Sequence, residues 1–260
     1  ADKWDAFPSL ALGWRLSEEE FMKKYNWISN LKLRLSFGYS GNNNGVSAYG
    51  TLARPNIDST VYYDFNGQLV SGFGVGAPVN RALTWEKTRE WNLGLDFGFL
   101  NNRINGSIDF YDKLSDGLLM GHTLAMESGV SGDDNQMIDN IGSVNNRGVE
   151  ISLNTVNVQT RNWEWTTTFT FAHNKNAIRS LYGRKEDVVG ESRFIGKPIN
   201  VIYDYLVDGV YSYAQWAAMT PETRVNMGAD RPGYARAIDT NGDGVMTPDD
   251  RIILGSSDPD

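Results

Sequence analysis

The sequence contains no cysteine, and this absence removes disulfides, thiolate metal sites and a cysteine nucleophile together. Positive charge is scarce too: 24 Lys and Arg against 32 Asp and Glu give a net charge of −8. Nucleic-acid binding requires clustered basic residues, and no basic stripe stands out, which argues against a nucleic-acid partner. The only histidines, His122 and His173, lack the spacing of a metal site or a catalytic triad, and no acid, base or nucleophile constellation indicates an enzyme.

Long apolar runs are missing as well. No stretch approaches the roughly 18 consecutive apolar residues of a membrane helix, so a helical span is excluded whereas a strand span is not. Residues 1–5 lack the basic and apolar regions of a signal peptide, and we therefore expect a longer precursor. Glycine, with 27 residues, and aromatics, at 12%, are abundant, which favours a β-rich protein with many turns.

Apolar and polar residues alternate with a period of two in at least six segments. Their lengths are close to the roughly 9–11 residues of a tilted membrane strand. The clearest runs through Leu31, Leu33, Leu35, Phe37 and Tyr39, with polar or small residues between them. The sequence therefore predicts strands at 9–16, 31–40, 90–100, 104–111, 149–154 and 163–171.

Connection lengths distinguish a membrane barrel from a soluble β-sandwich, since both bury one face of each strand. Residues 101–103 and 157–162 read as short hairpin turns. The long connections, of 44, 34 and 86 residues by subtraction, are 41–84, 114–147 and 175–260. Long loops on one side only are typical of an outer-membrane barrel, with short turns in the periplasm and long loops outside.

Six strands cannot close a barrel of this kind. Bacterial barrels begin at about 8 strands and plugged transporters have about 22. An open sheet would leave unpaired backbone groups in lipid, so we expect further strands before and after this chain. The sequence predicts an all-β chain in which 1–174 are barrel strands and 175–260 form an extracellular loop, with a short helix at 214–224.

Residues 239–250 match the twelve-residue calcium-loop template. Gly244 stands at position 6, where the template needs a sharp turn. The expected ligands, at positions 1, 3, 5, 7 and 12, are Asp239, Asn241, Asp243, Val245 and Asp250. Position 12 departs from the template, which has a longer glutamate there. The loop is either a structural Ca²⁺ site that restrains the last extracellular segment or an Asp/Gly-rich turn that binds no ion.

Several stretches, taken in order along the chain, resemble the C-terminal half of the SusC/RagA family of TonB-linked outer-membrane transporters of Bacteroidetes. They cover much of the chain, and the clearest are 7–21, 31–42, 83–88, 111–119, 140–150 and 239–259. The plug domain, the TonB-contacting segment and the C-terminal strand of the family have no counterpart here.

The resemblance implies one part of a barrel of about 22 strands in the cell outer membrane. It implies nutrient uptake powered through TonB, a SusD-like surface lipoprotein as lid, and an oligosaccharide or peptide as substrate. The residues do not choose between these substrates. The alternative is a secreted β-sandwich glycan-binding module with a dockerin-like calcium loop, although a dockerin would carry two such loops in tandem.

Overall fold

The computed structural model describes residues 4–46, 51–52, 62–72, 78–124, 127 and 136–258. By its internal contacts the chain divides into two compact units, Ala1–Asp187 and Val188–Pro259. Among the described residues, no helix has the length and apolar character needed to cross a membrane.

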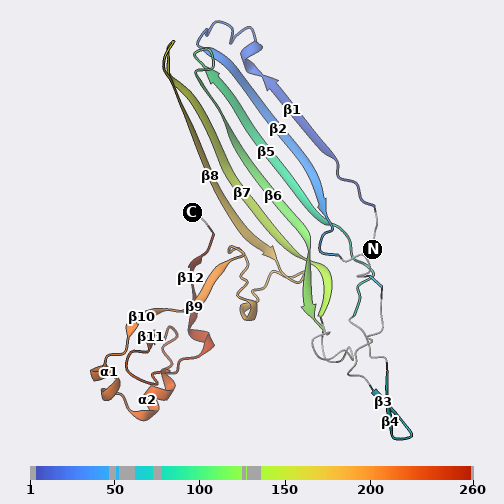
Figure 1. The fold of residues 1–260 in the computed structure, drawn as a ribbon, viewed down its shortest axis with the longest axis vertical. Helices are drawn as coiled ribbons and strands as arrows, with labels where there is room; N and C mark the ends of the chain where they lie inside the picture. Colours follow the sequence, from blue (N-terminus) through green and yellow to red (C-terminus); the bar gives the residue numbers. More distant parts are fainter. Residues whose placement is uncertain are drawn as a thin grey trace. The chain divides into compact units, whose positions relative to one another are not determined.

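The first unit is built on one six-stranded sheet, in which every neighbouring pair is antiparallel. Figure 1 shows its strands side by side. In spatial order they are β1 (Ser9–Arg15), β2 (Ile28–Asn42), β5 (Glu86–Phe99), β6 (Ile104–Thr123), β7 (Gln136–Gln159) and β8 (Glu164–Ser180). All six strands expected from the alternation are confirmed.

The register of the sheet collects the apolar residues on one face. Leu35 lies opposite Leu93, Leu93 opposite Phe110, and Phe110 opposite Val149. Because side chains alternate between faces along a strand, the intervening polar and small residues share the other face. The sheet therefore has an apolar face and a polar face.

Short turns close the sheet at one end. The turn between β5 and β6 places Leu100, Asn101 and Asn102 at φ of 53°, 56° and 59°. Asparagine tolerates this left-handed backbone better than most residues, which suits it to such a tight turn. The turn between β7 and β8 is closed by the Thr160 N–H, which donates to the Trp163 carbonyl at 2.7 Å. Both expected hairpins are present.

The prediction of a loop at 114–147 is wrong. β6 and β7 continue as a paired ribbon, and only residues 124–135 connect them. The register shifts between Asp116 and Leu118, where Gly117 adopts a φ of 65°. Such a bulge interrupts the alternation without ending the ladder, so the period-two pattern is lost while the strands persist.

The loop at 41–84 also has structure of its own. It contains a hairpin of β3 (Tyr62–Phe65) and β4 (Gln68–Ser71). Asn66 and Gly67 form the two-residue turn, both with positive φ, as expected for a tight hairpin connection.

The second unit folds as small elements and is not a structureless loop. The expected helix at 214–224 is two helices, α1 (Tyr213–Ala218) and α2 (Pro221–Asn226), with Ser212 and Thr220 as their caps. Its strands pair as β9 (Val201–Tyr205) with β12 (Arg251–Ser256), and as β10 (Val207–Val210) with β11 (Ala235–Ala237). The sequence-based division after 174 falls within β8, which continues to Ser180.

The apolar face of the large sheet is exposed. The exposed fractions of Leu12, Phe110 and Trp165 are 60%, 54% and 62%. A soluble sandwich would bury these side chains against a second sheet. The described residues outside the six strands form only two-stranded sheets. The β-sandwich alternative is therefore wrong.

Candidate functional site

The polar face carries an ion-pair cluster that links three strands. Arg34 on β2 donates from Nε and Nη2 to both carboxylate oxygens of Asp96 on β5, at 2.8–3.1 Å. The same Nη2 reaches Asp109 on β6 at 3.0 Å. One guanidinium thus bridges two carboxylates on successive strands, a geometry suited to its planar array of donors.

Gly94 is what allows Arg34 to reach across β5. In the register, Gly94 stands opposite both Arg34 and Asp109. A Cβ built on Gly94 would lie 2.6 Å from Asp109 Oδ1 and 2.7 Å from Arg34 Cζ. Any larger residue at this position would displace the bridge. The alternation placed these residues on one face but gave no sign that they touch.

Two asparagines fasten the chain where the sheet meets its long loops. Asn140 Nδ2 donates to the carbonyls of Gly117, at 2.7 Å, and Thr84, at 3.0 Å. Its Oδ1 accepts from the Thr84 N–H at 2.8 Å. Asn140 therefore ties the segment before β5 to the bulge in β6.

Asn145, 5% exposed, acts similarly further along β7. Its Nδ2 donates to Asp112 Oδ1 at 2.6 Å and to the Lys113 carbonyl at 3.0 Å, while its Oδ1 accepts from Arg179 at 3.2 Å. The sequence placed Asn140 and Asn145 only within a stretch of family resemblance, and their roles were missed. Because they bond to backbone groups far away in the chain, no local pattern marks them.

The expected calcium-loop residues fall in one compact turn of the second unit. Asp239 accepts the N–H groups of Gly242 and Gly244 at 2.6 and 2.7 Å. The Asn241 side chain accepts from the Asp243 N–H, and the Asp243 side chain accepts from the Val245 N–H, both at 2.8 Å. These bonds bend the loop around its own carboxylates.

Asp250 closes the loop from inside and is fully buried. Its carboxylate accepts the N–H groups of Thr247 at 2.8 Å, Thr240 at 3.0 Å and Asn241 at 3.4 Å. The bond from Thr247 is the main cause that holds the pKa of Asp250 below its usual 3.8, with the Asn241, Thr240 and Asp239 bonds adding to it.

The charge of these carboxylates is thus already balanced in part by the loop backbone. Among the residues that the structure describes, no group of three or more Asp, Glu, His or Cys side chains converges as a metal site would require. A cation here would depend on the Asn241 amide and the Val245 carbonyl in addition to the carboxylates of Asp239, Asp243 and Asp250. Those are hard oxygen donors of the kind Ca²⁺ prefers.

Comparison with known proteins identifies the family to which this chain belongs. Residues 1–249 match the family model for the TonB-dependent receptor-like β-barrel. The chain is 34% identical over 260 residues to the TonB-dependent receptor SusC of Bacteroides thetaiotaomicron, covering 97% of this chain and 25% of that protein. It is 32% identical over 274 residues to the TonB-dependent receptor P26 of Formosa agariphila, covering 100% of this chain and 26% of that one.

Solved structures agree. The RagAB peptide importer in its closed-closed state superposes with a TM-score of 0.67 at 26% identity, over 78% of this chain and 22% of that one. The chain thus spans about a quarter of the length of the curated relatives it matches. Since most of the chain matches the family model, it belongs to the TonB-dependent receptor β-barrel family, as part of a transporter barrel of the SusC/RagA type.

Proposed function

We propose that this chain forms part of the wall of an outer-membrane importer that takes up oligosaccharides or peptides. The observation that carries the proposal is the six-stranded antiparallel sheet with one apolar and one polar face, in a chain of the SusC/RagA type. The apolar face contacts outer-membrane lipid and the polar face, with Arg34, Asp96 and Asp109, lines the lumen.

The proposal includes two protein partners. A SusD-like surface lipoprotein closes the barrel from outside, and TonB supplies energy through a plug encoded elsewhere in the full protein. Support comes from the relatives, one named SusC and one described as the RagAB peptide importer. The long loops and the second unit lie on the extracellular side.

Uptake by a deletion strain tests this function. Cells lacking the full-length gene are supplied with labelled oligosaccharides and peptides, and uptake is compared with the parent and with the deletion strain complemented by the intact gene. We expect the deletion to abolish uptake of one substrate class and the intact gene to restore it. Unchanged uptake of every oligosaccharide and peptide would contradict an importer role.

We also propose that residues 239–250 hold one structural Ca²⁺ ion through Asp239, Asn241, Asp243, the Val245 carbonyl and Asp250. The matched positions of the calcium-loop template support this. The ion would add a rigid centre to the second unit, where backbone N–H groups already fix the same carboxylates.

Elemental analysis of the full-length protein tests the calcium proposal. After dialysis against low calcium, the protein should retain about one Ca²⁺ more than the Asp239→Asn/Asp243→Asn variant. The matched control is Asp249→Asn, which removes an exposed carboxylate from a position that the template does not use. A crystal structure in saturating calcium with no ion within about 2.6 Å of Asp239 and Asp243 would disprove the site.

A further inference from the structure

The apolar face of the sheet ends in charged side chains toward the long loops. Along β7, Val149 is followed on the same face by Arg147, and along β8, His173 is followed by Lys175. The register sets Arg147 beside both Lys175 and Asp112. All three charged side chains are exposed. We call Arg147 and Lys175 the basic pair.

The position along the strand at which the apolar residues of this face give way to charged residues differs from strand to strand. On β5 the apolar series extends to Trp91, which lies in the same cross-strand row as the basic pair. On β8 the series ends two rows earlier, at Phe171. A plane cutting across tilted strands gives such a stepped boundary, because each strand meets it at a different residue. The basic pair therefore lies at the edge of the apolar band.

The charge at this edge is predominantly positive. Arg147 and Lys175 form no ion pair with any described residue. The one acidic side chain of the row, Asp112, accepts a hydrogen bond from Asn145 at 2.6 Å. Beyond this row, Arg89 on β5 and Arg179 on β8 are exposed cations at the same edge, against one further exposed carboxylate, Asp116 on β6. In a chain of net charge −8, this local excess of cations stands out as an anion-binding surface.

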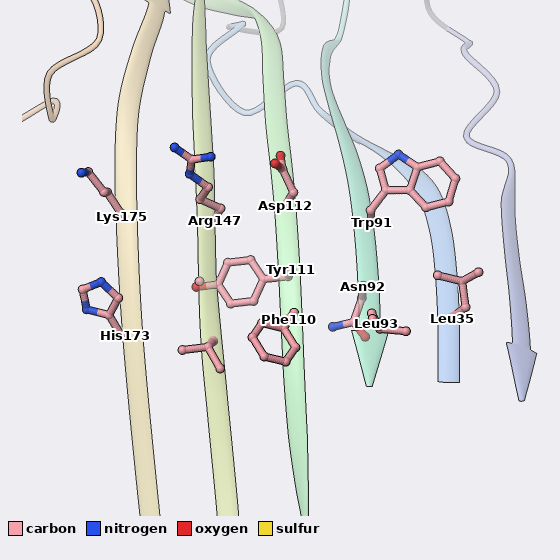
Figure 2. A pocket seen from close by; sticks show the side chains of 12 residues that line it. Leu35, Trp91, Asn92, Leu93, Phe110, Tyr111, Asp112, Arg147, His173 and Lys175 are labelled. Carbon is pink, nitrogen blue, oxygen red and sulfur yellow. The ribbon is translucent and has the colours of Figure 1, made fainter. Parts of the chain in front are cut away.

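The basic pair lines part of a groove of about 510 Å³ whose lining is otherwise mainly apolar. Figure 2 shows Arg147, Lys175 and Asp112 at one end of the group, with Phe110, Leu93 and Leu35 toward the other. Trp91 flanks it, and an indole at this depth is typical of a membrane interface. Fixed cations above an apolar groove match a lipid whose anionic head group is attached to acyl chains.

We propose that the basic pair and the groove below it bind the phosphorylated glycolipid of the outer leaflet, with its phosphate on Arg147 and Lys175 and an acyl chain along Phe110, Leu93 and Leu35. This rests on the proposed placement of the long loops outside the cell, since that orientation turns the basic pair toward the outer leaflet. Arginine and lysine form strong charge-assisted bonds to phosphate, and their aliphatic stems pack along the apolar surface.

Lipid binding by the full-length protein tests the inference. Purified in detergent, it is titrated with diphosphorylated lipid A, and bound lipid is counted by native mass spectrometry. The Arg147→Gln/Lys175→Gln variant should bind at least about tenfold more weakly, because two charged bonds to phosphate are lost. The charge-conserving Arg147→Lys/Lys175→Arg variant should bind nearly as well as the parent.

The matched control is Lys24→Gln/Arg161→Gln, which removes the same charge from exposed positions at the short-turn end. It should bind lipid A as the parent does. Dephosphorylated lipid A should bind weakly to every variant, and inorganic phosphate alone should not compete at millimolar concentration. Phosphatidylglycerol, an anionic lipid without the sugar, should compete poorly with lipid A.

Equal lipid A binding by the parent and the Gln variant would overturn the proposal, as would equal loss in the short-turn control. Phosphatidylglycerol competing as well as lipid A would overturn the assignment to the glycolipid. Each variant is first checked for heat-modifiable migration in gels, and the Lys/Arg swap decides the case if the Gln variant fails to fold. Uptake assays in the same cells report separately on the importer function, which can fail while lipid binding persists.

Discussion

At the scale of single residues, one glycine and one carboxylate determine the two best-defined local arrangements. Gly94 leaves room for Arg34 to bridge Asp96 and Asp109, and Asp250 gathers three backbone N–H groups inside its loop. The Arg34 bridge joins residues far apart in the sequence, whereas Asp250 bonds to backbone groups three to ten residues before it.

Replacement of Gly94 by valine should destabilise the barrel. The added side chain would occupy the space of the Arg34 guanidinium, and overpacking of this kind costs about 1–3 kcal/mol. The measurement is the temperature at which the full-length protein loses heat-modifiable migration. Gly121→Ala on β6 is the control, because a Cβ there would meet only ordinary contact, with Gln136 Oε1 at 3.4 Å. Equal temperatures for the parent and Gly94→Val would contradict the role of this glycine.

Asp250 should make the order of its loop depend on pH. The pKa of Asp250 is lower in the folded protein than the usual 3.8. The ionised carboxylate therefore stabilises the loop fully above pH 3.8, and this stabilisation is lost as the pH falls through the pKa of the folded state. Amide exchange at Thr240 and Thr247 in the full-length protein measures this protection. At neutral pH, Asp250→Asn should speed that exchange by about tenfold, since charged acceptors form the stronger bonds.

Asp249→Asn is the matched control, because Asp249 is exposed and its carboxylate accepts none of these N–H groups. Exchange at Thr240 and Thr247 should remain at the parent rate in this variant. Identical exchange rates in Asp250→Asn and the parent would show that the buried carboxylate does not hold the loop.

At the scale of elements, the alternation of each strand separates an apolar face, which we propose contacts lipid, from a polar face, which we propose lines the lumen. Leu95 lies in the middle of the apolar series of β5, and Asn92 lies on the opposite face of the same strand. The 24 residues of β7 exceed the roughly 9–11 that a membrane span needs, so in the proposed orientation the β6–β7 ribbon extends past the membrane on the long-loop side.

Arginine should therefore be tolerated on one face of β5 and not on the other. Leu95→Arg should destabilise the folded barrel by about 2–4 kcal/mol, the cost of a cation near the bilayer midplane. Asn92→Arg, which adds the same side chain to the lumen face, should cost far less. Urea unfolding of the full-length protein in lipid vesicles compares the two. Equal costs would mean that the faces are assigned wrongly.

At the scale of the whole molecule, the sheet has two open edges in the part of the chain that the structure describes. Among the described residues, β1 and β8 each pair with one neighbouring strand, so the backbone N–H and C=O groups on their outer sides have no strand partner there. In lipid such groups have no water to bond with. The relatives P26 and SusC are about four times as long as this chain, so they have the length for further strands.

The chain of residues 1–260 expressed alone with a secretion signal should therefore fail to form a barrel. We expect it in aggregates or bound to chaperones, and without heat-modifiable migration. The full-length protein expressed in parallel should show that migration in the outer-membrane fraction. A heat-modifiable, membrane-inserted species formed by 1–260 alone would contradict the need for further strands.

The sequence by itself determined the six strands, their two faces and the short hairpin turns, because a period of two is a local property that each strand displays independently. Only the tertiary structure decided the rest. The Arg34 bridge over Gly94 and the Asn140 and Asn145 bonds depend on cross-strand register, which pairing fixes between segments far apart in the chain. The bulge at Gly117 hid the extension of β6 and β7, since one extra residue breaks the alternation while the backbone ladder continues.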